Sequence, residues 1–240
     1  MKSNLTLIIL SALFLFAACS DKPSAGRDAA SAPAPADSPV TIRPSDNRSS
    51  SLPKIVAFGD SLTAGYGLAT SESYPALLGG MLERDGYGYE VVNAGVSGDT
   101  TTGGVQRIDW ALEGDVRMVV LELGANDMLR GLPVKVMKEN LAEIIKRAKA
   151  HGAQVVLAGM YATTNSGPEY QAEFRDAFES LARRHNVPLI PFFLMRVAGV
   201  ESLNQADGAH PNAEGTRIVA ETVYQAIRPL LDQTEEKASK

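Results

Sequence analysis

The chain has 240 residues, of which 45% are hydrophobic and 21% charged, a composition typical of a globular protein rather than a disordered or fibrous one. The formal net charge of −5 implies no strongly basic surface, so we expect no nucleic acid among the partners. The single cysteine excludes an intrachain disulfide framework and any metal site built from several cysteines.

The first residues have the features of a bacterial export signal. One lysine at position 2 precedes an apolar run that ends in Phe16-Ala17-Ala18-Cys19. This run has the length of a signal-peptide core and is too short for a comfortable membrane span. Small residues before a lone cysteine resemble a bacterial lipobox, so we predict a lipoprotein signal peptide over residues 1–18 and lipidation of Cys19. An ordinary secretory signal is the alternative.

Residues 19–52 are predicted to form a flexible tether. They are rich in Ser, Ala, Pro and Asp and have no apolar periodicity, so they cannot bury enough surface to offset chain entropy. By similarity to Gram-negative lipoproteins, Ser20 after the cysteine favours the outer membrane. We therefore expect a membrane partner through a lipid anchor on Cys19, and a cell-envelope protein that faces the periplasm.

From residue 53 onward, short apolar runs alternate with longer segments of helical spacing. This alternation is typical of a parallel sheet that is covered by helices on both faces. We predict one three-layer α/β domain over residues 53–232, followed by a flexible tail over 233–240, and we expect a monomer. The predicted strands are 54–58, 89–93, 118–123, 154–158 and 188–192, and the predicted helices are 74–84, 133–150, 169–185 and 214–231.

Several loops after these strands carry chemically useful residues, and in such sheets ligands bind outside the C-terminal strand ends. Ser61 follows the first strand and precedes a helix, where a turn exposes its hydroxyl beside free backbone N–H groups. Gly98 follows the second strand and, lacking a Cβ, can bring its N–H close to a ligand. Asn126 follows the third strand and offers a side-chain amide.

A late loop supplies Asp207 and His210, three residues apart. The carboxylate can accept the Nδ1 proton of His210 and leave Nε2 free to take a proton from Ser61. Each element alone has a simpler explanation as a turn, a helix cap or half of a metal site. Their occurrence together, in this order and at predicted strand ends, favours nucleophilic catalysis.

Together these residues resemble the four sequence blocks of the SGNH (GDSL) hydrolase family. The resemblance spans essentially residues 53–231 and implies a flavodoxin-like α/β/α sandwich whose five-stranded parallel sheet has the order 2-1-3-4-5. The longer matches resemble the bacterial acyl-CoA thioesterase I/lysophospholipase L1/arylesterase subfamily. They are Phe58–Tyr66, Val96–Thr101, Leu121–Asp127, Val187–Phe193 and Asp207–Asn212.

The resemblance also implies roles for the residues. Ser61 would be the nucleophile, His210 the base and Asp207 the residue that orients the base, with Ser61, Gly98 and Asn126 as oxyanion donors. The expected reaction is hydrolysis of a small-molecule acyl ester through an acyl-serine, without a metal or cofactor. Lysophospholipids, aryl esters and acyl thioesters are the expected substrates, and envelope esters are favoured because acyl-CoA is cytosolic.

Three alternatives remain open at this point. A nucleotide- or phosphate-binding module is disfavoured because the loop after the first strand lacks the spacing and lysine of a P-loop. A non-catalytic envelope lipoprotein with the same fold would leave p-nitrophenyl esters untouched. A carbohydrate O-deacetylase would share the fold and the catalytic residues but not the substrate.

Overall fold

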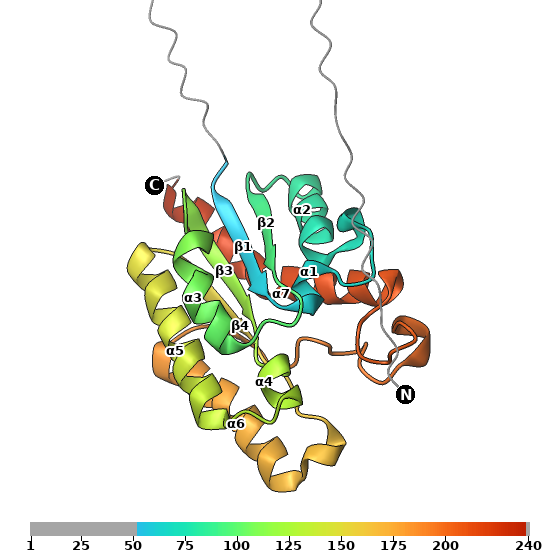
Figure 1. Ribbon diagram of the computed structural model, residues 1–240. Helices are drawn as coiled ribbons and strands as arrows, with labels where there is room; N and C mark the ends of the chain where they lie inside the picture. Colours follow the sequence, from blue (N-terminus) through green and yellow to red (C-terminus); the bar gives the residue numbers. More distant parts are fainter. Residues whose placement is uncertain (1–51, 239–240) are drawn as a thin grey trace, which may run out of the picture. The chain divides into compact units, whose positions relative to one another are not determined.

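Five parallel strands form a single sheet with the order β2-β1-β3-β4-β5 (Figure 1). The computed structural model describes residues 52–238, so the predicted signal peptide, Cys19 and nearly all of the predicted tether lie outside the described residues. The predicted fold class and strand order are confirmed. The strands are β1 (Lys54–Gly59), β2 (Glu90–Gly95), β3 (Val116–Glu122), β4 (Gln154–Ala158) and β5 (Leu189–Ile190).

Helices cover both faces of the sheet (Figure 1). On one face, α2 (Tyr74–Arg84) packs against α7 (Ala213–Ala238). On the other face, α3 (Thr101–Ala111), α5 (Val134–His151) and α6 (Pro168–His185) pack side by side. The short elements are α1 (Ser61–Ala64), η1 (Thr70–Glu72), α4 (Ala125–Leu129), η2 (Thr164–Ser166) and η3 (Glu201–Leu203).

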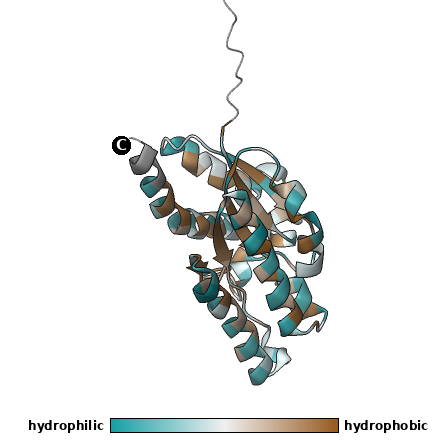
Figure 2. Cartoon of the chain, turned by 90° about the vertical axis from the view of Figure 1, so that its left-hand side faces the viewer, coloured by the Kyte–Doolittle hydropathy of each residue, from teal (hydrophilic) through white to brown (hydrophobic). Residues whose placement is uncertain are grey.

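The core lies between the sheet and these helices. Residues 55–58 of β1 are at most 1% exposed, as expected of a strand that is covered on both faces. Helix α5 buries Met137, Leu141, Ile144 and Ala148, a spacing that places them on one helical face. Figure 2 shows the result, with apolar residues on the sheet and polar residues on the outer sides of the helices. None of the helices within residues 52–238 is long and apolar enough to cross a membrane.

Helix α3 was not predicted from the sequence. Its first turn contains Gly103 and Gly104, which lower helix propensity. A Cβ on Gly104 would lie 2.5 Å from Leu123 Cδ1, so this glycine permits the close approach of α3 to the sheet. Tertiary packing therefore outweighs local propensity here.

Two other element boundaries differ from the prediction. Strand β5 comprises only Leu189–Ile190, because Pro191 cannot donate to the sheet. Helix α7 continues from the expected end at Leu231 to Ala238, through most of the segment that was expected to be a flexible tail. Residues 232–238 contain no glycine or proline that would end the helix.

Candidate active site

Ser61, His210 and Asp207 form a continuous hydrogen-bonded series. Ser61 Oγ lies 2.9 Å from His210 Nε2, and His210 Nδ1 lies 2.7 Å from Asp207 Oδ2. Ser61 begins α1 directly after β1, while the other two residues come from the loop before α7. Because a carboxylate can only accept, Nδ1 carries the ring proton of neutral His210, and Nε2 is left to accept a proton from Ser61.

The loop that contains Asp207 holds this carboxylate in its ionised form. Asp207 Oδ1 accepts hydrogen bonds from the backbone N–H groups of His210 at 3.0 Å and Ala209 at 2.9 Å. These two bonds, together with the His210 ring, lower the pKa of Asp207 to about 2. The Tyr66 ring packs against the His210 ring with 4.8 Å between their centroids, which limits the rotation of the imidazole.

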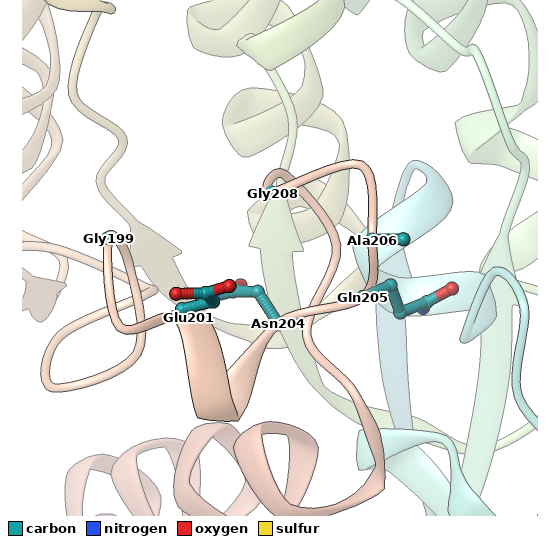
Figure 3. Close-up of a pocket in the computed structure, with 6 residues that line it drawn as sticks. All are labelled: Gly199, Glu201, Asn204, Gln205, Ala206 and Gly208. Carbon is teal, nitrogen blue, oxygen red and sulfur yellow. The ribbon is translucent and has the colours of Figure 1, made fainter.

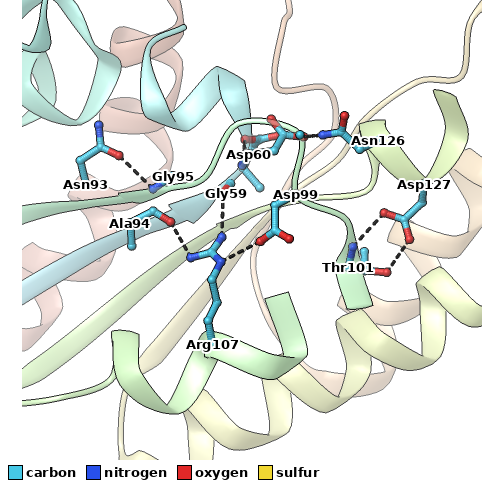
Figure 4. Close-up of polar contacts among 12 residues, drawn as sticks. Gly59, Asp60, Asn93, Ala94, Gly95, Asp99, Thr101, Arg107, Asn126 and Asp127 are labelled. Carbon is cyan, nitrogen blue, oxygen red and sulfur yellow. Dashed lines mark hydrogen bonds and ion pairs between the residues drawn. The ribbon is translucent and has the colours of Figure 1, made fainter. Parts of the chain in front are cut away.

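Asn126 lies on the β3 side of Ser61, and Gly98 follows β2 on the other side. Asn126 Nδ2 donates to Asp60 Oδ2 at 2.9 Å (Figure 4). Asn126 and Ser61 line the same cavity. Gly98 has a φ of 80°, a conformation that favours glycine, and its carbonyl accepts from Arg130 Nη2 at 2.6 Å. Gly98 is not among the residues that line this cavity.

A cavity of about 610 Å³ lies beside Ser61 and is lined mainly by apolar side chains. Tyr161 and Phe192 stack on each other in its wall, with ring centroids 4.2 Å apart. The loop after β4 contributes Tyr161, Thr163 and Thr164. The other apolar lining residues are Leu62, Ala125, Met128, Leu129, Met160, Ala162, Leu194, Ala198 and Ala209.

Four apolar residues in the segments after β3 and β5 differ in their relation to this cavity. Leu129 does line the cavity, and it is 68% exposed. Phe193 is fully buried in the core, where its ring lies 5.3 Å from that of Tyr74. Leu132 and Met195 are not among the lining residues.

A more polar cavity of about 440 Å³ adjoins the first one (Figure 3). The two cavities share Gly199, Asn204 and Gly208. Glu201 and Gln205 line only the polar cavity. The region around His210 therefore has an apolar side and a polar side.

The family model described as GDSL-like Lipase/Acylhydrolase matches residues 57–218. The chain belongs to this family. It is 41% identical over 178 residues to the esterase TesA of Pseudomonas aeruginosa, covering 74% of this chain and 89% of that protein. It is 33% identical over 186 residues to thioesterase 1/protease 1/lysophospholipase L1 of Escherichia coli strain K12. This match covers 77% of this chain and 88% of that protein. A crystal structure of TesA is similar with a TM-score of 0.72 at 40% identity, covering 74% of this chain and 99% of that one.

Arg107 in this GDSL hydrolase joins the ends of β1 and β2. Its guanidinium donates to Gly59 O at 2.8 Å and to Ala94 O at 2.7 Å, and it pairs with Asp99 at 2.7 Å (Figure 4). The loops that carry Ser61 and Gly98 start from these two strand ends. Sequence reasoning did not identify Arg107, because the helix that carries it was not predicted.

Asp127 connects α4 to α3. Its carboxylate accepts from the backbone N–H of Thr101 at 2.8 Å and from the Thr101 hydroxyl at 2.6 Å (Figure 4). Asp127 therefore caps the start of α3 rather than the start of its own helix. The contact fixes α4, and with it Asn126, relative to the loop after β2.

Two buried carboxyl groups lie behind Ser61 and were not assigned a role from the sequence. Asp60 and Glu122 are both fully buried. Burial raises the pKa of Asp60 to about 6, while burial and then the charge of Asp60 raise the pKa of Glu122 well above its usual range. The sequence did contain a signal for Glu122, because it is an acidic residue within the apolar run 118–123 and a carboxyl group is rarely found in a buried strand.

Within residues 52–238, no group of three or more His, Cys, Asp or Glu side chains is arranged to hold a metal ion. The remaining histidines lie at helix ends, His151 at the end of α5 and His185 at the end of α6.

Proposed function

We propose that this chain is a carboxylic-ester hydrolase that forms a covalent acyl-Ser61 intermediate. The reaction class follows from its membership of the GDSL-like lipase/acylhydrolase family. The roles of the individual residues rest mainly on one contact, the 2.9 Å separation of Ser61 Oγ and His210 Nε2. This is the geometry that general-base activation of a serine nucleophile requires.

In the acylation step, His210 Nε2 takes the Ser61 proton as Ser61 Oγ attacks the carbonyl carbon of the ester. The carbonyl oxygen becomes an oxyanion, which accepts from the backbone N–H groups of Ser61 and Gly98 and from Asn126 Nδ2. The tetrahedral intermediate then collapses, and His210 returns the proton to the leaving alcohol. Asp207 stays ionised, so it stabilises the imidazolium that forms in between.

In the deacylation step, a water molecule attacks the acyl-serine, and His210 again acts as the base. The same three donors hold the second oxyanion. Collapse releases the free acid and restores the Ser61 hydroxyl. Both steps use only the Ser61, His210, Asp207 and Asn126 side chains, the backbone N–H groups of Ser61 and Gly98, and water.

The lining of the cavity favours esters of fatty or aromatic acids. Its volume of about 610 Å³ lies within the range of small-molecule sites, and Asp60 and His210 are the ionisable side chains among the described residues of its wall, apart from the Tyr161 phenol. We propose lysophospholipids and aryl esters as the substrate classes, with acyl thioesters as further substrates. The apolar wall disfavours the alternative of a carbohydrate O-deacetylase.

We further propose that the protein acts as a monomeric lipoprotein in the cell envelope, anchored to the outer membrane through Cys19 and facing the periplasm. The support is the apolar run that ends at the only cysteine, followed by Ser20 and a Pro- and Ala-rich tether. Such an anchor would keep the site near lysophospholipids and away from cytosolic acyl-CoA. Metabolic labelling with a palmitate probe tests this: the wild type should be labelled and Cys19→Ala should not. Equal labelling of both would contradict it.

The function is tested with the full-length chain and a panel of esters. The panel contains p-nitrophenyl esters from acetyl to palmitoyl, a lysophosphatidylcholine, palmitoyl-CoA and an acetylated sugar, with Ser61→Ala as the matched control. We expect hydrolysis of the acyl esters by the wild type and background rates for the variant. Absence of hydrolysis across the panel would contradict the proposal, and selective cleavage of the acetylated sugar would favour the deacetylase.

A further inference from the structure

Behind Ser61 lies a cluster of buried polar side chains that the proposed reaction does not use. Glu122, Asp60, Thr63 and Tyr74 are all 0% exposed. Glu122 Oε1 has no hydrogen-bond partner among residues 52–238. Buried polar atoms are normally paired, so an unpaired carboxyl oxygen next to a candidate nucleophile requires a physical explanation.

The cluster is connected to the candidate oxyanion donor by short contacts. Glu122 Oε2 accepts from the Thr63 hydroxyl at 2.8 Å and from the backbone N–H of Asp60 at 3.3 Å. Asp60 Oδ1 accepts from Leu62 N at 3.1 Å, and Asp60 Oδ2 accepts from Asn126 Nδ2 at 2.9 Å (Figure 4). Glu122 therefore acts on Asn126 only through Asp60.

The geometry favours a neutral Glu122. An ionised carboxylate here would have one oxygen without a donor, no cationic side chain of residues 52–238 in contact, and the Asp60 carboxyl beside it. Burial and the charge of Asp60 accordingly raise the pKa of Glu122 well above its usual range, whereas that of Asp60 is raised only to about 6. Because the unpaired oxygen belongs to Glu122 and Asp60 is bound to two donors, we expect the pair to hold its shared proton on Glu122 at neutral pH.

A charged Asp60 also determines the orientation of the Asn126 amide. A carboxylate only accepts hydrogen bonds, so it must face the amide nitrogen of Asn126 rather than the amide oxygen. One N–H of Nδ2 is bound to Asp60, and the second N–H remains for a ligand in the cavity that Asn126 lines.

We propose that Glu122, as a neutral carboxylic acid, is a positioning residue that holds Asp60 in place and thereby aims the Asn126 amide at the oxyanion. The inference rests on the proposed ester hydrolysis. A second negative charge at Glu122 would repel Asp60, disturb the Asn126 contact and oppose the negative charge that develops on the substrate.

The contact between the Thr63 hydroxyl and Glu122 Oε2 depends on the glycine at position 59. A Cβ on Gly59 would lie 2.0 Å from Thr63 Oγ1 and 2.5 Å from Glu122 Oε2, so only glycine leaves room for the contact. The titratable groups of other elements that interact electrostatically with the carboxyl pair are Tyr74 from α2 and His210 from the loop before α7. Arg107 of α3 binds Gly59 O and pairs with Asp99 instead.

The test compares two substitutions in the full-length chain, Glu122→Gln and Glu122→Leu. Gln is neutral, and its amide oxygen can accept from the Thr63 hydroxyl and from the Asp60 backbone N–H as Glu122 Oε2 does, so E122Q should keep kcat within about threefold of the wild type. E122L removes these contacts and should lower kcat by about 10- to 100-fold with little change in KM, because an oxyanion donor acts mainly in the transition state. With rising pH the wild type should lose kcat as Glu122 ionises, and E122Q should not.

Two measurements separate positioning from a merely structural role. In an Asn126→Ala background, E122L should cause little further loss of kcat, because both changes remove the same donor. Leu141→Ala, on the buried face of α5, serves as a stability control: it should lower the melting temperature without changing kcat. Equal loss of kcat in E122Q and E122L, or fully additive losses in the double variant, would overturn the proposal.

Two further readouts do not depend on turnover. Wild type and Ser61→Ala should show the infrared band of a protonated carboxylic acid at neutral pH, and E122Q should lack it. The Asn126 side-chain amide signals, identified by their absence in Asn126→Ala, should stay in place in E122Q and move in E122L. Lack of ester hydrolysis would count against the proposed function alone, whereas a missing infrared band or unmoved amide signals would count against the role of Glu122.

Discussion

Gln205 Nε2 donates to the carbonyl oxygen of Tyr66 at 2.7 Å and so connects the loop that carries His210 to the loop that follows Ser61. The same nitrogen donates to Pro211 O at 3.0 Å, which holds the chain directly after His210. The contact requires Gly67, because a Cβ there would lie 2.2 Å from Gln205 Oε1. The distance between the proposed nucleophile and its base therefore depends on a residue outside the triad.

Replacing Gln205 tests this relationship. Glu has the same shape but cannot donate to the two carbonyl groups, so Gln205→Glu should lower kcat by about tenfold or more through misplacement of His210. Gln225→Ala, on the exposed side of α7, is the matched control and should retain wild-type kcat. Steady-state kinetics with a p-nitrophenyl ester measures both. Wild-type kcat in Gln205→Glu would show that the loops hold their separation without this side chain.

The role of Asp207 is tested by Asp207→Asn. The amide cannot hold the Nδ1–H tautomer of His210 in the same way, and comparable changes in serine hydrolases lower kcat by about 10⁴. Because the pKa of Asp207 is lowered to about 2, the wild-type carboxylate remains ionised throughout the usual assay range. The acidic limb of the wild-type pH–rate profile should therefore lie well above the pKa of Asp207. If kcat were retained in Asp207→Asn and the acidic limb of its pH–rate profile disappeared, the role of Asp207 in orienting His210 would be contradicted.

The stacked pair Tyr161 and Phe192 is expected to influence acyl-chain preference. Removing one ring opens the wall of the apolar cavity, so Tyr161→Ala should shift kcat/KM toward longer or bulkier acyl groups. Trp110→Ala changes an aromatic residue that is 66% exposed on α3, outside this cavity, and should leave the preference unchanged. The measurement is the ratio of kcat/KM for butyryl and decanoyl p-nitrophenyl esters. An unchanged ratio in Tyr161→Ala would show that the acyl group does not contact this wall.

The buried Glu122 should also make stability depend on pH. Its folded-state pKa lies above the ordinary value of 4.5, so the native state keeps a proton that the unfolded chain releases above that pH. Stability should therefore decrease as pH rises from 4.5 through the raised pKa, and Glu122→Gln should remove this contribution. Urea unfolding at about pH 5 and about pH 8 measures the effect, and the stability of E122Q relative to the wild type should increase with pH. A constant difference between the two proteins would contradict a raised pKa.

The parts of the fold that follow from local patterns were accessible from the sequence. Apolar strands alternating with amphipathic helices predicted the layers, and the resemblance of the Ser61, Asn126 and His210 segments to one family predicted the strand order. Helix α3 was missed because Gly103 and Gly104 are poor helix formers, and its stability comes from packing and from Asp127 on another element. Contacts of this kind join residues distant in sequence, which no local pattern reports.

The candidate site residues could be predicted from local motifs, whereas the residues that support them act through contacts between distant parts of the chain. Ser61, Gly98, Asn126, Asp207 and His210 are marked by motifs. Arg107 and Gln205 act through backbone carbonyl groups, which leave no pattern in the sequence. Glu122 was visible as an acidic residue in an apolar strand, but its partner Asp60 and the missing donor to Oε1 appear only in three dimensions.

The most direct measurement is the location of the covalent adduct that an esterase-directed phosphonate forms with the full-length chain. After complete inhibition by a p-nitrophenyl phosphonate, peptide mass spectrometry should find one phosphonyl group, on Ser61. Neither Ser61→Ala nor the heat-unfolded wild type should be labelled, since reaction requires both the hydroxyl and His210 at hydrogen-bond distance. An adduct on another residue with concurrent loss of esterase activity, or hydrolysis that persists in Ser61→Ala, would contradict the assignment of Ser61 as the nucleophile.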